Sequence, residues 1–293
     1  MATNFETILY EVSDRVATLT LNRPERLNAI NFQLANELPM AVQKAAADPD
    51  VHVIVLQGAG KGFCGGYDLT EYAEDHDEGP CTQDIMPWDP TLDFQAMWGN
   101  TENFMSLWRC NKPVITKIHG AAAAGGSDIA LCSDMIIMAD DAVIGYPPAR
   151  VWGVPTTMMW VYRLGIEKAK RMLFTGDLIT GKEAEDMGLI LKSVPADQLD
   201  AEVQKLADRI KGVPRNQLMM CKMSVNQAYE NMGLKTTQMF ATMFDGVARH
   251  SPEGKWFEER ATEAGFKQAV KERDSGAPIA EGRSKDFREL GLS

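Results

Sequence analysis

Two glycine-rich segments can offer backbone N–H groups to a negatively charged oxygen. The first spans residues 58–69 (GAGKGFCGGYDL) and the second spans residues 119–131 (HGAAAAGGSDIAL). Each follows a predicted strand and precedes a predicted helix, so small residues uncover N–H groups at the positive end of a helix. Two such turns can supply one donor each to an oxyanion. The structural alternative is that glycine and alanine simply allow helix and sheet to pack closely.

Other glycine motifs fit this sequence less well. Gly60, Gly62 and Gly65 satisfy the G-x-G-x-x-G spacing of dinucleotide-binding loops. That motif is short, and it does not follow the first strand of an evident mononucleotide-binding unit, which disfavours a dinucleotide site. A P-loop is excluded, because Lys61 is followed by glycine and not by Ser or Thr.

The elements that must position these turns follow an α/β order. Alternating apolar residues predict a hairpin over residues 8–21, and the apolar run at residues 51–56 is typical of a strand covered on both faces. Further strands are predicted at residues 114–118 and 135–138, and helices at residues 31–47, at residues 95–109 and after Gly126. Helices between the strands imply a parallel sheet.

After Val194 the pattern predicts helices and no strand. Amphipathic spacing indicates helices at residues 197–211, 215–230, 234–249 and 253–272. We therefore divide the chain into an α/β core, residues 1–195, and a helical C-terminal region, residues 196–293.

Composition excludes several classes of protein. The chain has 293 residues, 45% of them hydrophobic, which suffices for a large buried core. Its net charge of -11 disfavours nucleic acid and anionic membranes as partners. Ten acidic residues and no Lys or Arg lie between Asp68 and Trp108, in a stretch that can form a cap over a site or a solvated face. Five cysteines without Cys-x-x-Cys spacing, and no signal peptide or membrane span, lead us to expect a cytoplasmic protein.

Four motifs together resemble the crotonase (enoyl-CoA hydratase/isomerase) superfamily, and the resemblance runs nearly end to end. LNRPERLNAI at residues 21–30 is similar to the family's opening motif, and FCGGYDL at residues 63–69 to its first oxyanion segment. Residues 115–135 fit the signature around Gly-(x3)-Ala-Gly-Gly, and residues 165–189 fit the usual continuation.

The resemblance implies a spiral of ββα units, a helical C-terminal region that forms trimers, and acyl-CoA thioester substrates. It places the two oxyanion donors on the backbone N–H groups of Tyr67 and Gly125. Gly66 and Asp68, beside the first donor, and Arg23 and Arg26, in the opening motif, are then expected to bind substrate. The implied assembly is a homotrimer or a hexamer, and the implied reaction needs no metal and no cofactor beyond the coenzyme A of the substrate.

The sequence departs from the hydratase pattern at its two catalytic glutamates. Asp128 stands at the first of these positions, and the segment expected to carry the second, residues 145–153, has no acid. We expect Asp128 to be catalytic, against the alternative that it only stabilises a helix N-terminus. Tyr146 and Arg150 are candidates for the vacant position, as a proton donor and as an anchor for a substrate carboxylate.

These observations predict an enzyme that stabilises a thioester enolate, in first place an enoyl-CoA hydratase-like lyase or isomerase. The alternatives are the same fold with decarboxylase or C–C/thioester hydrolase chemistry on a carboxylated or keto acyl-CoA, and a non-catalytic acyl-CoA binder. Among the remaining residues, we expect a structural role for His119 and buried, unreactive thiols at Cys64 and Cys132.

Overall fold

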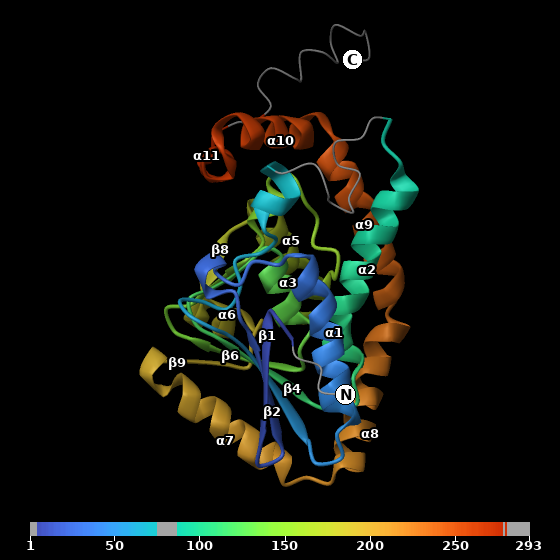
Figure 1. The fold of residues 1–293 in the computed structure, drawn as a ribbon, viewed down its shortest axis with the longest axis vertical. Coiled ribbons are helices and arrows are strands. Elements are labelled where there is room, and N and C mark those ends of the chain that lie inside the picture. The colour runs from blue at the N-terminus through green and yellow to red at the C-terminus, as the bar shows by residue number, and fades with distance from the viewer. Residues whose placement is uncertain (1–4, 75–86, 278, 280–293) are drawn as a thin grey trace, which may run out of the picture.

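A six-stranded sheet forms the centre of the protein (Figure 1). The computed structural model describes residues 5–74, 87–277 and 279. The strand order is β1-β2-β3-β4-β6-β9, and all neighbours are parallel except the β1–β2 hairpin. The strands are β1 (Ile8–Ser13), β2 (Val16–Leu21), β3 (Val53–Gly58), β4 (Val114–Ile118), β6 (Met135–Ala139) and β9 (Lys192–Val194). The predicted hairpin and parallel strands are confirmed.

A second, three-stranded sheet was not predicted. Its order is β5-β7-β8, with β5 (Ala121–Ala123) parallel to β7 (Val143–Gly145) and β8 (Leu178–Thr180) antiparallel to β7. Each strand is only three residues long, which is too short for alternation of apolar and polar residues to become visible. The sheet matters for function because β5 leads directly into the second glycine turn.

Helices of the core follow the strands. They are α1 (Phe32–Ala47), α2 (Pro90–Arg109), α3 (Gly125–Leu131), α4 (Met159–Leu164), α5 (Ile166–Thr175) and α6 (Gly181–Met187), with a π-helical turn at Thr70–Glu74. The α2 helix begins earlier than predicted, because Asp89 caps it by accepting hydrogen bonds from Thr91 and Leu92 N–H groups. Pro90 at the first helical position favours the same start.

In the part of the chain that the structure describes, five α-helices follow β9: α7 (Leu199–Lys211), α8 (Arg215–Asn231), α9 (Leu234–His250), α10 (Pro252–Ala264) and α11 (Phe266–Arg273). The α7 helix packs on the main sheet, α9 lies beside α2, and α10 and α11 lie across the opposite end of the molecule (Figure 1). The single helix predicted at residues 253–272 is wrong: Gly265, with φ 82°, separates α10 from α11. The boundary between residues 195 and 196 stays a prediction.

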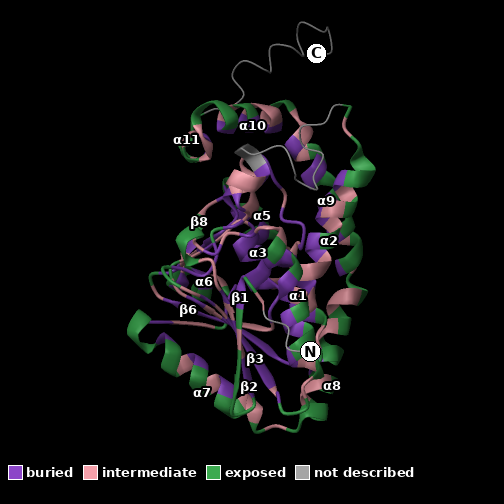
Figure 2. Cartoon of the chain, in the orientation of Figure 1, coloured by how far each residue is buried: buried purple, intermediate pink, exposed green. Residues whose placement is uncertain are grey.

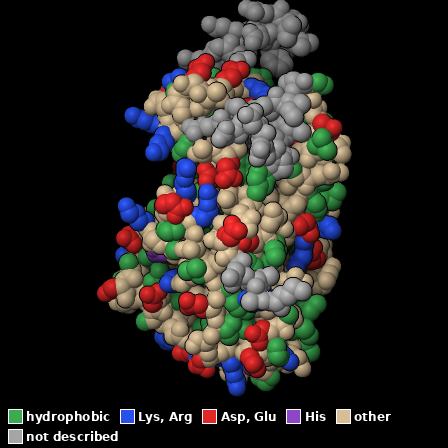
Figure 3. All heavy atoms as spheres, in the orientation of Figure 1, with side chains coloured by type: hydrophobic (Ala, Val, Ile, Leu, Met, Phe, Trp, Pro, Cys, Tyr) green, Lys and Arg blue, Asp and Glu red, His purple; other side chains and the backbone are tan. Residues whose placement is uncertain are grey.

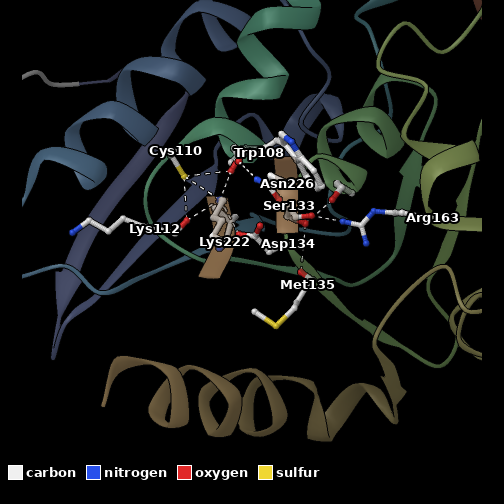
Figure 4. A network of polar contacts seen from close by, with 12 residues as sticks. Trp108, Cys110, Lys112, Ser133, Asp134, Met135, Arg163, Lys222 and Asn226 are labelled. Atoms are coloured by element: carbon white, nitrogen blue, oxygen red, sulfur yellow. Dashed lines mark hydrogen bonds and ion pairs between the residues drawn. The ribbon is translucent and has the colours of Figure 1, made fainter. Parts of the chain in front are cut away.

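A buried lysine fastens α8 to the core (Figure 4). Lys222 Nζ forms an ion pair of 2.9 Å with Asp134 and donates to the carbonyl oxygens of Leu107 and Lys112 at 2.8 and 2.9 Å. One turn further along α8, Asn226 donates to the carbonyl oxygen of Trp108 at 2.8 Å. These bonds satisfy carbonyl groups at the C-terminal end of α2, so that α8 and the chain leading into β4 support each other.

The core is continuous across the sheet and its inner helices (Figure 2). Phe63, Phe104 and Trp160 are among its largest fully buried side chains. The four described cysteines are free thiols, and Cys64 and Cys132 are buried as expected; Cys81 lies outside the described residues. Nowhere in the described ranges is a helix both long and apolar enough to cross a membrane.

Candidate active site

The two glycine turns lie side by side because their backbones pair. Cys64 N–H donates to the carbonyl oxygen of Ala121 at 2.9 Å, and Ala123 N–H donates to the carbonyl oxygen of Cys64 at 3.0 Å. A Cβ atom added to Gly126 would lie 2.3 Å from the oxygen of Cys64. The absence of a side chain at Gly126 is therefore what allows the second turn to pack against the first.

Tyr67 and Gly125, the two predicted oxyanion donors, are neighbours in this arrangement. A Cβ atom on Gly125 would lie 3.0 Å from Cδ2 of Tyr67. Gly125 is the first residue of α3, so its N–H group has no carbonyl one turn earlier in the helix. Tyr67 forms a parallel bridge with Ile30, in which Ile30 N–H donates to the Gly66 carbonyl oxygen and Asp68 N–H donates to the Ile30 carbonyl oxygen. The N–H group of Tyr67 therefore points away from Ile30.

Both donors line a cavity of about 610 Å³. Six of the nine predicted site residues line it: Arg26, Tyr67, Asp68, Gly125, Asp128 and Tyr146. Gly66 adopts φ 105° immediately before Tyr67, where it directs the turn without contributing to the wall. Arg23 and Arg150 are also absent from the wall.

Asp128 is a buried carboxyl group in this cavity. It is 2% exposed, and Thr157 Oγ1 donates a hydrogen bond of 2.5 Å to its Oδ1. The pKa of Asp128 is raised to about 8, chiefly by burial; the Thr157 hydroxyl opposes the shift, and the negative charge of Asp245 adds to it. The carboxyl group thus bonds to the buried Thr157 hydroxyl, whereas a helix-capping role would direct it to N–H groups of α3. Its protonated form is available near neutral pH as an acid.

Tyr146 occupies the wall as a neutral phenol. Its side chain is buried, and burial raises its pKa well above the ordinary value, assisted by the negative charges of Asp128 and Asp245. A phenol in this state can donate a hydrogen bond but does not ionise near neutral pH.

Arg150 is not placed to hold a substrate carboxylate. Its guanidinium pairs with Asp274 at 3.0 Å and with Asp177 at 3.6 Å, and the residue does not line the cavity. The two acids already occupy its hydrogen-bonding fork. The predicted role of Arg150 as an anchor is therefore corrected to that of an ion-paired link between the core and the end of α11.

The two arginines of the opening motif, Arg23 and Arg26, lie in different surroundings. Arg23 pairs with Asp68 at 2.9 Å and donates to the carbonyl oxygen of Ala29, so it links the opening motif to the first glycine turn from behind the cavity wall. Arg26 is exposed at the cavity, and Lys267 of α11 is exposed there as well. Lys267 had no sequence signal of its own, because a lone lysine on a mixed-charge helix resembles any solvated residue.

A further buried acidic group at the cavity had no signal in the sequence. Asp245, in α9, lines the cavity and is 3% exposed. Its Oδ1 accepts a hydrogen bond of 2.9 Å from the N–H group of Val154, and its Oδ2 pairs with Arg249. Arg249 also pairs with Asp93 of α2 at 2.5 Å. Burial raises the pKa of Asp245, opposed by the Arg249 guanidinium and the Val154 N–H group.

The acidic stretch of the sequence contributes to the site through Asp68, which lines the cavity, and through Asp93, which is 1% exposed and holds Arg249. Four of its ten acids, Asp75, Asp77, Glu78 and Asp84, lie outside the described residues. The predicted cap over the site falls on this segment and is likewise outside them. The remaining wall is largely apolar and aromatic, with Leu69, Met97, Trp152, Phe266 and Val270 among its members. Such a surface suits a hydrocarbon chain.

Metal chemistry has no candidate site within residues 5–74 and 87–277: no group of three or more His, Cys, Asp and Glu side chains there could hold an ion. On the face shown in Figure 3, Lys and Arg side chains lie interspersed with Asp and Glu. That face therefore offers no uniform basic surface to a phosphate backbone.

Known proteins share this sequence and fold. The sequence model of the enoyl-CoA hydratase/isomerase family matches residues 11–263. A Mycobacterium bovis protein named as a probable enoyl-CoA hydratase is 34% identical over 231 residues, covering 78% of this chain and 84% of the relative. A Dictyostelium discoideum protein, named as a probable mitochondrial enoyl-CoA hydratase, is 32% identical over 77% of each chain.

Solved structures agree with the sequence relatives. The crystal structure of an enoyl-CoA hydratase from Mycobacterium smegmatis superimposes with a TM-score of 0.87 at 49% identity, covering 93% of this chain and 94% of that one. An enoyl-CoA hydratase/isomerase from Xanthobacter autotrophicus Py2 gives a TM-score of 0.85 at 29% identity, over 94% of this chain and all of that one. The predicted crotonase-like α/β fold is confirmed, and the chain belongs to the enoyl-CoA hydratase/isomerase family of acyl-CoA enzymes.

Proposed function

We propose that the protein adds water across the α,β double bond of an enoyl-CoA thioester. The observation that carries this proposal is the placement of Asp128, a carboxyl group kept protonated by burial, in the same cavity as the backbone of Tyr67 and Gly125. A proton donor beside a pair of oxyanion donors is what the addition requires.

The reaction begins with the thioester oxygen between the N–H groups of Tyr67 and Gly125. As oxygen adds to the β carbon, negative charge develops on the thioester oxygen, and each preorganised donor contributes about 3–4 kcal/mol to the transition state. Asp128 then donates its proton to the α carbon. The Tyr146 phenol can hydrogen-bond to oxygen atoms in the same cavity.

Substrate binding divides between the depth and the rim of the cavity. The apolar and aromatic wall takes the acyl chain, and exposed Arg26 and Lys267 meet the phosphates of coenzyme A. Asp68, held by Arg23, shapes the wall next to Tyr67. Coenzyme A enters as part of the substrate, and no other cofactor is required by this scheme.

The alternative chemistries receive less support. Decarboxylation or hydrolysis of a carboxylated or keto acyl-CoA rests on the absence of an acid in residues 145–153 and on Arg150 as an anchor, and that guanidinium is paired with Asp177 and Asp274. A purely binding role would leave the raised pKa of Asp128 without a use.

We also propose that the protein assembles as a homotrimer, or as a hexamer of two trimers. The support is an exposed apolar ridge along α8 and α9, formed by Met220, Met223, Val225, Met232, Met239, Phe240, Met243, Phe244 and Val247. Many exposed apolar side chains on two neighbouring helices are typical of an interface between chains. The cytoplasmic location stays a prediction.

The proposed activity is tested by incubating the purified protein with crotonyl-CoA and with longer trans-2-enoyl-CoAs, and following loss of the ultraviolet absorbance of the conjugated thioester. We expect turnover, with a chain-length preference set by the apolar wall. Malonyl-type and β-ketoacyl-CoAs serve as the comparison set. Turnover confined to that set would contradict the proposal and restore the decarboxylase or hydrolase alternative.

A further inference from the structure

Hydration needs a group that removes a proton from water, and residues 145–153, where a second carboxylate was sought, contain no acid. The cavity nevertheless has two buried carboxyl groups besides Asp128: Asp68, which is paired with Arg23 beside Tyr67, and Asp245. Asp245 reaches it from α9, an element that the chain enters only after the α/β core is complete.

Two contacts fix the orientation of Asp245, and a third fixes its partner Arg249. The Val154 N–H group binds Oδ1, and Arg249 binds Oδ2 from the next turn of the same helix. Asp93 holds the other side of the Arg249 guanidinium. These contacts preorganise the carboxyl group, and they favour its anionic form against burial, which raises its pKa.

The glycine at position 153 brings Asp245 close to Tyr146. A Cβ atom on Gly153 would lie 3.4 Å from Oδ1 of Asp245 and 3.3 Å from the Tyr146 hydroxyl. The carboxylate and the phenol thus both lie close to Gly153, and both line the cavity. Two polar groups that lie close together in a cavity wall can bind the same water molecule.

The charges of the site also argue for two different roles. Asp93 and Asp245 share the guanidinium of Arg249, while the described hydrogen bond to the Asp128 carboxyl group comes from the neutral hydroxyl of Thr157. When two carboxyl groups share a cavity, the one with a cationic partner loses its proton more readily than the one with a hydroxyl partner. Asp245 is suited to accept a proton and Asp128 to donate one.

We propose that Asp245 is the base of the hydration reaction and takes the proton from the water that attacks the β carbon. This inference rests on the proposed hydratase function. In the step, an O–H bond of water breaks and its proton passes to Asp245 while the C–O bond forms. The π electrons move to the thioester as an enolate, and Asp128 gives its proton to the α carbon. Proton exchange with solvent then restores both carboxyl groups.

The experiment separates water addition from enolate formation. Hydration of crotonyl-CoA needs both acids under this proposal, whereas exchange of the α hydrogens of butyryl-CoA in D2O needs only Asp128 and the oxyanion donors. We expect Asp245→Asn to lower the hydration rate at least 100-fold and to keep the exchange rate within threefold of wild type. Asp128→Asn is expected to lose both reactions.

The matched control is Asp134→Asn, a largely buried aspartate that is ion-paired with Lys222 outside the cavity. It should lower the melting temperature while leaving hydration and exchange near wild type. Hydration by Asp245→Asn within threefold of wild type would overturn the proposal, as would a parallel loss of hydration and exchange in a variant with a native circular dichroism spectrum.

Should Asp245→Asn fail to fold, Asp245→Glu keeps the charge opposite Arg249 and displaces the carboxylate by one methylene. We expect at least a tenfold loss of hydration with exchange retained, and equal losses of both would refute the assignment. Wild-type protein that exchanges the α hydrogens of butyryl-CoA but hydrates no enoyl-CoA would overturn the proposed function itself.

Discussion

Thr157 and Asp128 are joined by a hydrogen bond of 2.5 Å, from the Thr157 hydroxyl to Oδ1 of the carboxyl group. The bond favours the anion and so opposes the rise of the pKa to about 8, which is caused chiefly by burial. Thr157 therefore tunes the acid strength of Asp128 from an element that is distant in the chain.

This relationship predicts the alkaline limb of the activity profile. Because Asp128 must be protonated to donate, we expect kcat/KM for enoyl-CoA to fall as the pH rises through about 8. Thr157→Val removes a donor to the anion, so its limb should move to higher pH. The measurement is kcat/KM between pH 6 and 10. Thr116→Val, a buried threonine of β4, is the control, and an unshifted limb in Thr157→Val would refute the coupling.

Asp128→Asn should change how stability depends on pH. The folded protein keeps the Asp128 proton up to about pH 8, whereas the unfolded chain loses it near pH 4. Between these values the folded state binds the extra proton, so this group lowers wild-type stability as the pH rises through that window. Asparagine does not titrate. Relative to wild type, the variant should gain up to about 5 kcal/mol of unfolding free energy between pH 4 and 8.

Urea unfolding at a series of pH values measures that difference. The comparison between variant and wild type cancels the titration of the other carboxyl groups. Parallel stability curves for the two proteins would show that Asp128 ionises in the fold as it does in the unfolded chain.

Gly125→Ala should damage the oxyanion site directly. The new Cβ atom would lie 2.8 Å from Ile30 Cδ1 and 3.0 Å from Tyr67 Cδ2, so Tyr67 must shift. We expect kcat to fall about 100-fold, as for the loss of one oxyanion donor, and stability to fall by about 1–3 kcal/mol from overpacking. Steady-state kinetics and thermal unfolding measure the two effects.

The control for this substitution is Gly99→Ala, in the middle of α2, where an added Cβ meets nothing within 4 Å. It should keep wild-type kinetics and raise stability by about 1 kcal/mol through helix propensity. Wild-type kcat in Gly125→Ala would show that the position of Tyr67 does not matter for the reaction.

Arg150→Ala distinguishes the two acyl-CoA chemistries. Because the guanidinium is engaged with Asp177 and Asp274, its removal should cost less than about 1 kcal/mol per pair and should leave the ranking of substrates unchanged. Competition between enoyl-CoA and a carboxylated acyl-CoA provides the readout. Selective loss of the carboxylated substrate would restore Arg150 as an anchor.

The exposed ridge on α8 and α9 predicts self-association. Phe240 and Phe244 stack at 6.4 Å and are each 57% exposed. The double substitution Phe240→Asp/Phe244→Asp should shift the mass measured by light scattering from a trimer or hexamer toward the monomer. Met40→Asp, on exposed α1 surface, is the control. An unchanged mass in the double variant would place the interface elsewhere.

The positions of Tyr67 and Gly125 could be predicted because their signals are local. Glycine turns after apolar strands mark both segments, and the resemblance to a family joins them. The pairing of Cys64 with Ala122 then brings the turns together. Asp128 was found in the same way, since it follows Gly125 within one helical turn.

Asp245 and Arg150 show why other features could not be predicted. Asp245 is one acid on an amphipathic helix, and only the packing of α9 beside α2 directs it into the cavity. Arg150 attracted a binding role because nothing near it in the sequence shows that Asp177 and Asp274 lie within reach. Both depend on contacts between residues that are distant in the chain.

The backbone hydrogen bonds between the two glycine turns have an evolutionary consequence. In the proposed reaction, the groups offered to the thioester oxygen belong to the main chain, and backbone bonds between Cys64 and residues 121–123 hold their two turns together. The proton-handling residues Asp128, Tyr146 and Asp245 come from three separate elements. Mutation can therefore replace the acid or the base one at a time while enolate stabilisation persists, and new chemistry can arise without passing through an inactive ancestor.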